Sequence, residues 1–186
     1  GYAIWGASLV DEADFTAQNL KDAGKGAVPG EVMIHELVHQ WWGLGNMFDE
    51  TSPDSPWSAE GLTVYTTYRI VKELYGAEYA RECYVEQWQK AVDAYERNFH
   101  VRHPEYLDAL PEDKQWEISN QLSQVRQYSE MPLKILKAEE LVGGEQAMDQ
   151  ILHTLFNREI DPMYPYLTYE EFLNACGLTE EDLNLD

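Results

Sequence analysis

Cysteine is scarce in this chain of 186 residues. Its two cysteines, Cys83 and Cys176, lie far apart in the sequence. This spacing matches neither a zinc knuckle nor a redox pair, and two cysteines are too few for a disulfide framework. We therefore expect both to be free or buried thiols. A chain of this length is long enough to form one domain, residues 1–186, with a sizeable core.

Basic residues are scarce as well. Thirteen lysines and arginines face 34 acidic residues, which gives a formal net charge of -21. Such a surface repels phosphate backbones, so we expect no nucleic-acid partner. It attracts cations, including divalent metals and basic peptides. The same charge also keeps a protein soluble, and we take solubility as its main role.

Long apolar runs are missing too. No stretch of about 18 apolar residues is present, so we expect no membrane span in this chain. We also find no signal peptide. The chain begins at Gly1, without methionine, in residues that read as a strand. We therefore expect it to be part of a longer protein with further domains.

Most of the chain has the pattern of helices. Residues 2–12 predict a short strand, in which Gly6 marks a bulge or a close backbone approach. Residues 100–113 contain proline and predict a loop. Apolar spacing, caps and glycines predict helices over residues 31–42, 58–75, 77–99, 114–142 (in two pieces), 145–158 and 168–176. The predicted fold class is mainly α (α+β), with a short N-terminal edge strand or hairpin.

The segment from His35 to His39 carries the clearest chemical signal. Its order is His35-Glu36-Leu-Val-His39. Positions four apart share one face of a helix, so both imidazoles can bind one metal ion. Glu36 follows His35 directly and can take a proton from a metal-bound water. Two ordinary helical histidines are the alternative, and we consider it weaker.

A catalytic zinc needs a third protein ligand and an open fourth position. Glu60, at the start of the next predicted helix, is the best candidate for that ligand. It could instead be only a first-turn acid favoured by the helix dipole. Asp49, Glu50 and Asp54, in the intervening predicted loop, are weaker candidates.

These residues resemble a known family. His35-Glu-Leu-Val-His-Gln-Trp-Trp-Gly43 is similar to the zinc helix of the aminopeptidase N-like gluzincin metallopeptidases. Trp57-Ser-Ala-Glu60-Gly61 resembles that family's segment with the third ligand, although Ala59 stands where asparagine is usual. The resemblance covers roughly residues 1–175. It implies a thermolysin-like helical catalytic lobe, one Zn²⁺ per chain, and His35, His39 and Glu60 as its ligands.

Two further family features are relevant. The stretch that starts at Tyr128 resembles the family's segment with a catalytic tyrosine, which implies that Tyr128 stabilises the oxyanion. A packing tyrosine is the alternative, because the chain has 12 tyrosines. The family's glutamate that binds the substrate amine is missing from residues 1–6. Asp11 or Glu12 could replace it, but no argument from the sequence places either one.

The resemblance implies zinc-dependent hydrolysis of a peptide substrate, aminopeptidase-like, with Glu36 as the general base. The alternative is a non-catalytic zinc-binding or interaction module, derived from a peptidase, within a larger protein. An intact Glu36 argues against the module, because a structural zinc site needs no base.

Overall fold

The N-terminal residues form a β-hairpin. The structure, a computed structural model, describes residues 1–11, 31–49 and 57–185. Strand β1 (Tyr2–Ile4) pairs antiparallel with β2 (Ala7–Leu9), so that Ile4 lies opposite Ala7. Gly6 has φ +71°, a value that favours glycine, in the two-residue turn between the strands. The predicted bulge or close approach at Gly6 is therefore wrong, since the glycine permits a tight turn.

The rest of the described chain is mainly helical, which confirms the predicted fold class. The α-helices are α1 (Glu31–Val38), α2 (Ala59–Tyr75), α3 (Ala77–Ala80), α4 (Glu86–Glu96), α5 (Phe99–Arg102), α6 (Pro104–Leu107), α7 (Glu112–Val125), α8 (Met131–Val142), α9 (Glu145–Phe156) and α10 (Tyr169–Cys176). Two π-helical segments, η2 (Arg81–Val85) and η3 (Arg126–Glu130), join α3 to α4 and α7 to α8, and η4 (Glu181–Leu183) is a 3₁₀ turn. No described helix is long and apolar enough to cross a membrane.

The predicted loop over residues 100–113 is the main error in the predicted elements. Two short helices, α5 and α6, occupy half of it. The side chain of Asn98 caps α5 by accepting a hydrogen bond from the backbone N–H of His100. Pro104 starts α6, where a missing N–H costs nothing. Proline was interpreted as a loop signal, but here it marks the start of a helix.

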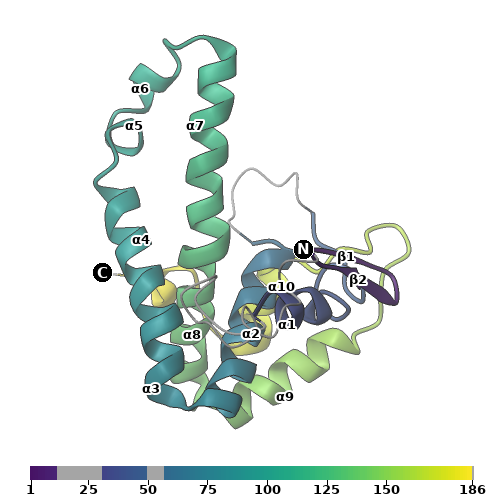
Figure 1. The fold of residues 1–186 in the computed structure, drawn as a ribbon. Coiled ribbons are helices and arrows are strands. Elements are labelled where there is room, and N and C mark those ends of the chain that lie inside the picture. The colour runs from purple at the N-terminus through teal and green to yellow at the C-terminus, as the bar shows by residue number, and fades with distance from the viewer. Residues whose placement is uncertain (12–30, 50–56, 186) are drawn as a thin grey trace.

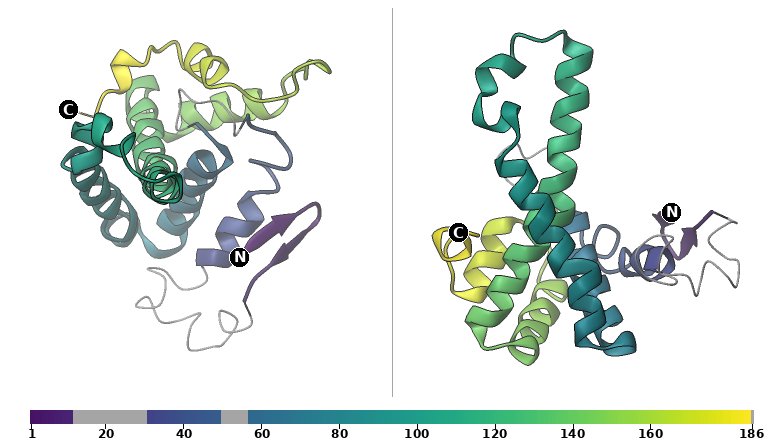
Figure 2. Two further views of the ribbon diagram at one scale, coloured as in Figure 1. Left: turned by 90° about the horizontal axis from the view of Figure 1, so that it is seen from above. Right: turned by 60° about the vertical axis from the view of Figure 1, so that its left-hand side comes forward.

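The elements form a body with two projections. Helices α4 and α7 lie side by side as a long pair that extends away from the body, with α5 and α6 at its far end (Figure 1). The β-hairpin lies against α1 at another side of the molecule (Figure 2).

Helix α2 lies between two apolar clusters. Leu62 and Tyr65 belong to the first cluster, together with buried residues of α8, α9 and α10. Val64 and Val71 belong to the second, together with Tyr84, Trp88 and other residues of the α3–α4 run. Because both faces of α2 are buried, the helix has little freedom to shift.

The start of α2 is held separately. Ser58 caps the helix by accepting a hydrogen bond from the backbone N–H of Glu60. The buried Trp57 donates from Nε1 to the Leu167 carbonyl at 2.9 Å and stacks on Phe172. The first turn of α2, which carries Glu60, is therefore fixed on the C-terminal part of the chain.

Gly61 allows α2 and α8 to approach closely. A Cβ at this position would lie 2.5 Å from Cγ and 3.0 Å from Cβ of the buried Met131. We predict that Gly61→Ala lowers the free energy of unfolding by about 1–3 kcal/mol in urea denaturation, because the core becomes overpacked. Helix propensity alone predicts the opposite sign, a gain of about 1 kcal/mol. A measured gain in stability would contradict the close approach. In the double variant with Met131→Ala, the loss of unfolding free energy should be smaller than the sum of the losses in the two single variants.

Candidate functional site

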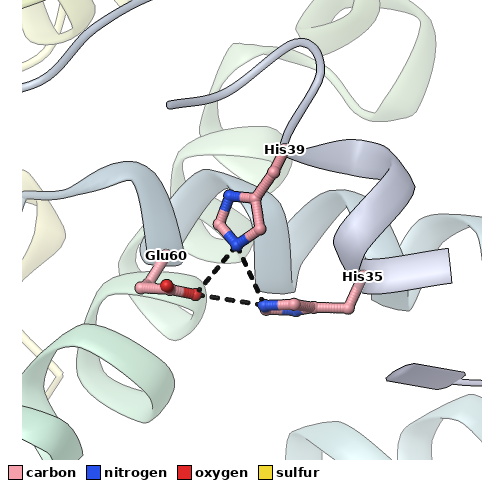
Figure 3. A group of neighbouring side chains, drawn as sticks. All are labelled: His35, His39 and Glu60. Carbon is pink, nitrogen blue, oxygen red and sulfur yellow. Dashed lines mark hydrogen bonds and ion pairs between the residues drawn. The ribbon is translucent and has the colours of Figure 1, made fainter. Parts of the chain in front are cut away.

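Three side chains from two helices meet at one point. His35 lies on α1, His39 follows its last turn, and Glu60 lies in the first turn of α2 (Figure 3). The His39 N–H still bonds to the His35 carbonyl, which keeps the two histidines one turn apart. His35 Nε2 lies 3.2 Å from His39 Nε2, and Glu60 Oε2 lies 3.1 Å and 3.5 Å from these two nitrogens.

These distances fit a tetrahedral metal ion. Ligand atoms about 2.0–2.1 Å from a tetrahedral zinc lie roughly 3.3–3.4 Å from one another. The three measured separations fall on both sides of this value. Glu60 Oε2 is buried and has no hydrogen bond among the described residues, although both imidazoles lie within ion-pair distance. The three atoms therefore converge on a common point, and two histidines with a carboxylate are a donor set that suits zinc.

The pKa values of Glu60 and His39 are shifted by their mutual contact. Burial alone raises the pKa of the Glu60 carboxyl, but His35 and His39 outweigh it and lower this pKa to about 2. Glu60 is therefore ionised at neutral pH. Burial lowers the pKa of His39, but Glu60 and the Trp42 carbonyl outweigh it, so that the net shift is upward. Protons and a metal ion consequently compete for His39.

His39 is held in place from behind. Its Nδ1 lies 3.0 Å from the Trp42 carbonyl and 3.2 Å from Thr63 Oγ1. A proton on Nδ1 that is donated to the Trp42 carbonyl leaves the lone pair of Nε2 for a metal. Sequence reasoning missed Thr63. Its position, three residues after Glu60 on one face of α2, was the signal that could have found it.

Glu36 lies beside the three candidate ligands. Its side chain is 8% exposed, and it lines the same cavity of about 420 Å³ as His35, His39 and Glu60. The backbone of Gly1, just before β1, passes close to it, because a Cβ at Gly1 would lie 2.3 Å from Glu36 Oε1. The cavity thus presents a carboxylate next to the candidate metal position and leaves open space in front of it.

Tyr128 lines this cavity too, from η3. Its ring is stacked on that of His35 with 6.4 Å between the centroids. Tyr128 therefore comes from a different part of the chain than the candidate metal ligands, but it lines the same cavity beside His35. Tyr166, which the sequence interpretation did not single out, lines the cavity as well.

The hairpin forms one wall of the cavity through residues 1–3. The Gln40 side chain holds it by accepting from the Gly6 N–H at 3.0 Å and donating to the Ile4 carbonyl at 2.9 Å. Among the described lining residues, Glu36 and Glu60 are the only carboxylates.

The two weaker acidic candidates that the structure describes, Asp11 and Asp49, do not line the cavity. Asp11 is not among the described lining residues of the cavity. Asp49 accepts a hydrogen bond from the Tyr164 hydroxyl and does not line the cavity either. Glu12, Glu50 and Asp54 lie outside the described residues.

Comparisons with known proteins agree with this geometry. The Peptidase family M1 domain matches residues 5–158. A similar curated protein is leucine aminopeptidase 2 from Emericella nidulans, which is 34% identical over 70 residues. That alignment covers 38% of this chain and 11% of the relative's length. No solved structure gives a significant match.

The contact between Thr63 and His39 gives a prediction. Thr63→Val keeps the buried shape but removes the hydroxyl beside Nδ1, and we expect the affinity for Zn²⁺ to fall about tenfold. Competition with a chromogenic chelator measures the Kd for Zn²⁺. Thr67→Val is the matched control, because Thr67 is equally buried and lies one turn further along α2. Among the described residues, its hydroxyl bonds only to the Thr63 carbonyl. Equal losses in the two variants would contradict a role for Thr63 in holding His39.

Proposed function

The chain belongs to peptidase family M1, and from this premise we propose that it catalyses zinc-dependent hydrolysis of peptide bonds, in the manner of an aminopeptidase. One observation carries the proposal. The buried Glu36 lines the same cavity as His35, His39 and Glu60, whose donor atoms lie within 4.8 Å of one another.

Each residue has a role that its position supports. His35, His39 and Glu60 would hold one zinc ion per chain. When bound, zinc supplies a Lewis acid that polarises the scissile carbonyl and makes the attacking water more acidic. Glu36 takes the proton from this water and passes it to the leaving amine. Tyr128 donates its phenol proton in a hydrogen bond to the oxyanion that develops on the carbonyl oxygen.

The open cavity favours catalysis over a purely structural metal site. A structural zinc site closes its fourth position with protein. Here the three candidate ligands border about 420 Å³ of open volume, and a buried carboxylate lies beside them. The relative's name, leucine aminopeptidase, supports removal of terminal residues. Because the match covers 11% of that protein, we also propose that this chain, as one domain, acts with further domains.

The role of Glu36 can be tested by removing only its charge. We predict that Glu36→Gln lowers kcat for peptide hydrolysis by about 10²–10⁴ and leaves about one zinc per chain, because general base catalysis is lost while the metal ligands stay. Peptide turnover and elemental analysis of the same preparation give both numbers. If the wild type binds zinc and is active, unchanged turnover in Glu36→Gln would refute Glu36 as the base.

The role of Tyr128 needs a separate test. Tyr128→Phe keeps the ring stacked on His35 but removes the hydroxyl. We expect kcat to fall about 10²–10³-fold with little change in KM, because an oxyanion donor acts mainly in the transition state. Zinc content should stay the same. If KM rises and kcat stays unchanged, the hydroxyl binds substrate and does not stabilise the oxyanion.

A further inference from the structure

A second cavity lies next to the candidate metal site. It has a volume of about 350 Å³ and shares two lining residues, His35 and Tyr128, with the first cavity. The stacked rings of these residues therefore stand at the junction of the two spaces. A peptide bond at the metal site would place a neighbouring substrate side chain within reach of the second cavity.

A carboxylate and a phenol lie close together in the wall of the second cavity. Glu31, in the first turn of α1, lines it, and none of the described basic groups lies within ion-pair distance of its carboxylate. Tyr84 is 6% exposed, and its hydroxyl interacts with the neighbouring Glu31 carboxylate. The Tyr84 oxygen itself accepts no hydrogen bond among the described residues. Burial raises the pKa of Glu31, as expected for a carboxylate without enough compensating positive charge. Burial and the charge of Glu31 also raise the pKa of Tyr84.

Apolar side chains form part of the remaining wall, beside Cys83 and the rings of His35 and Tyr128. Val32, Val64 and Trp88 line the same cavity. An occupant that fits this space has a long apolar stem and a group at its end that donates hydrogen bonds and carries positive charge. Lysine and arginine side chains have this construction. Their positive charge also suits a chain with a formal net charge of -21.

We propose that this cavity is a specificity subsite for a lysine or arginine side chain next to the scissile bond, with Glu31 pairing with the cationic group and Tyr84 Oη accepting one of its hydrogen bonds. The apolar stem packs against Val32, Val64 and Trp88. This assignment rests on the proposed peptidase function, because it places the bond to be cut at the neighbouring metal site.

The experiment compares peptides that differ in charge at one position, where lysine and norleucine share the same carbon stem and glutamate carries the opposite charge. Alanine-based pentapeptide amides carry lysine, norleucine or glutamate at one position, and each position is varied in turn. In the zinc-loaded protein, kcat/KM is measured for the wild type, for Glu31→Gln and for Glu112→Gln. Glu112 is exposed in the first turn of α7 and lines neither cavity, so its variant controls for the loss of one negative charge.

We expect the wild type and Glu112→Gln to prefer lysine over norleucine by about tenfold or more at one position beside the cut bond. Glu31→Gln should reduce this preference to about twofold or less, mainly through a lower kcat/KM for the lysine peptide. Tyr84→Phe should reduce it partially, which gives a second variant if Glu31→Gln does not fold. Equal preference for lysine in wild type and Glu31→Gln would overturn the subsite.

A binding measurement separates the subsite from the proposed activity. Calorimetry gives the Kd of the lysine and norleucine peptides for Glu36→Gln and for Glu36→Gln with Glu31→Gln. If no peptide is cut by the wild type but lysine binds more tightly only when Glu31 is present, the subsite holds and the proposed hydrolysis fails. If the norleucine peptide is cut but lysine has no advantage in binding or in cleavage, hydrolysis holds and the subsite is refuted.

Discussion

The packing of α1 against α2 is the constraint on which the candidate site depends. Three donor atoms must stay within 3.1–3.5 Å of one another, yet they come from two helices. A lateral shift of about 1 Å between these helices would pull the set away from the separations that a tetrahedral metal requires. The two apolar clusters around α2, its capped first turn and the hydrogen bond between Thr63 and His39 together prevent such a shift.

Gln40 and Gly43 belong to the zinc-helix motif but are not candidate ligands. The structure gives each of them a structural role. Gln40 attaches the hairpin to α1 through its side-chain amide. Gly43 has φ +108°, and a Cβ on it would lie 3.0 Å from Ala59 Cβ and 3.4 Å from His39 Nδ1. Glycine is therefore required there on two grounds, backbone conformation and space. The alanine at position 59, unusual for the family, lies in this crowded region between α2 and the end of α1.

The sequence predicts what depends on short-range order. The interval between His35 and His39 follows from one helical turn, and the Ser58 cap and the capping box at Thr168 follow from local side-chain bonds. The cavity beside Glu31 could not be predicted, because Tyr84 and Trp88 reach it only through tertiary packing of the α3–α4 run against α2. The loop predicted around Pro104 is wrong, because a proline can start a helix as well as interrupt one.

The π-helical segment η3 has a geometric consequence for Tyr128. Such a segment accommodates about one residue more than a regular α-helix does, which rotates everything after it by about 100°. Helices α7 and α8, which η3 joins without a gap in the sequence, are thus out of phase, and Tyr128 lies where the phase changes. The direction of the phenol relative to the buried face of α8 is consequently set by residue count, so a one-residue deletion elsewhere within 126–130 would turn it away even though Tyr128 itself is kept.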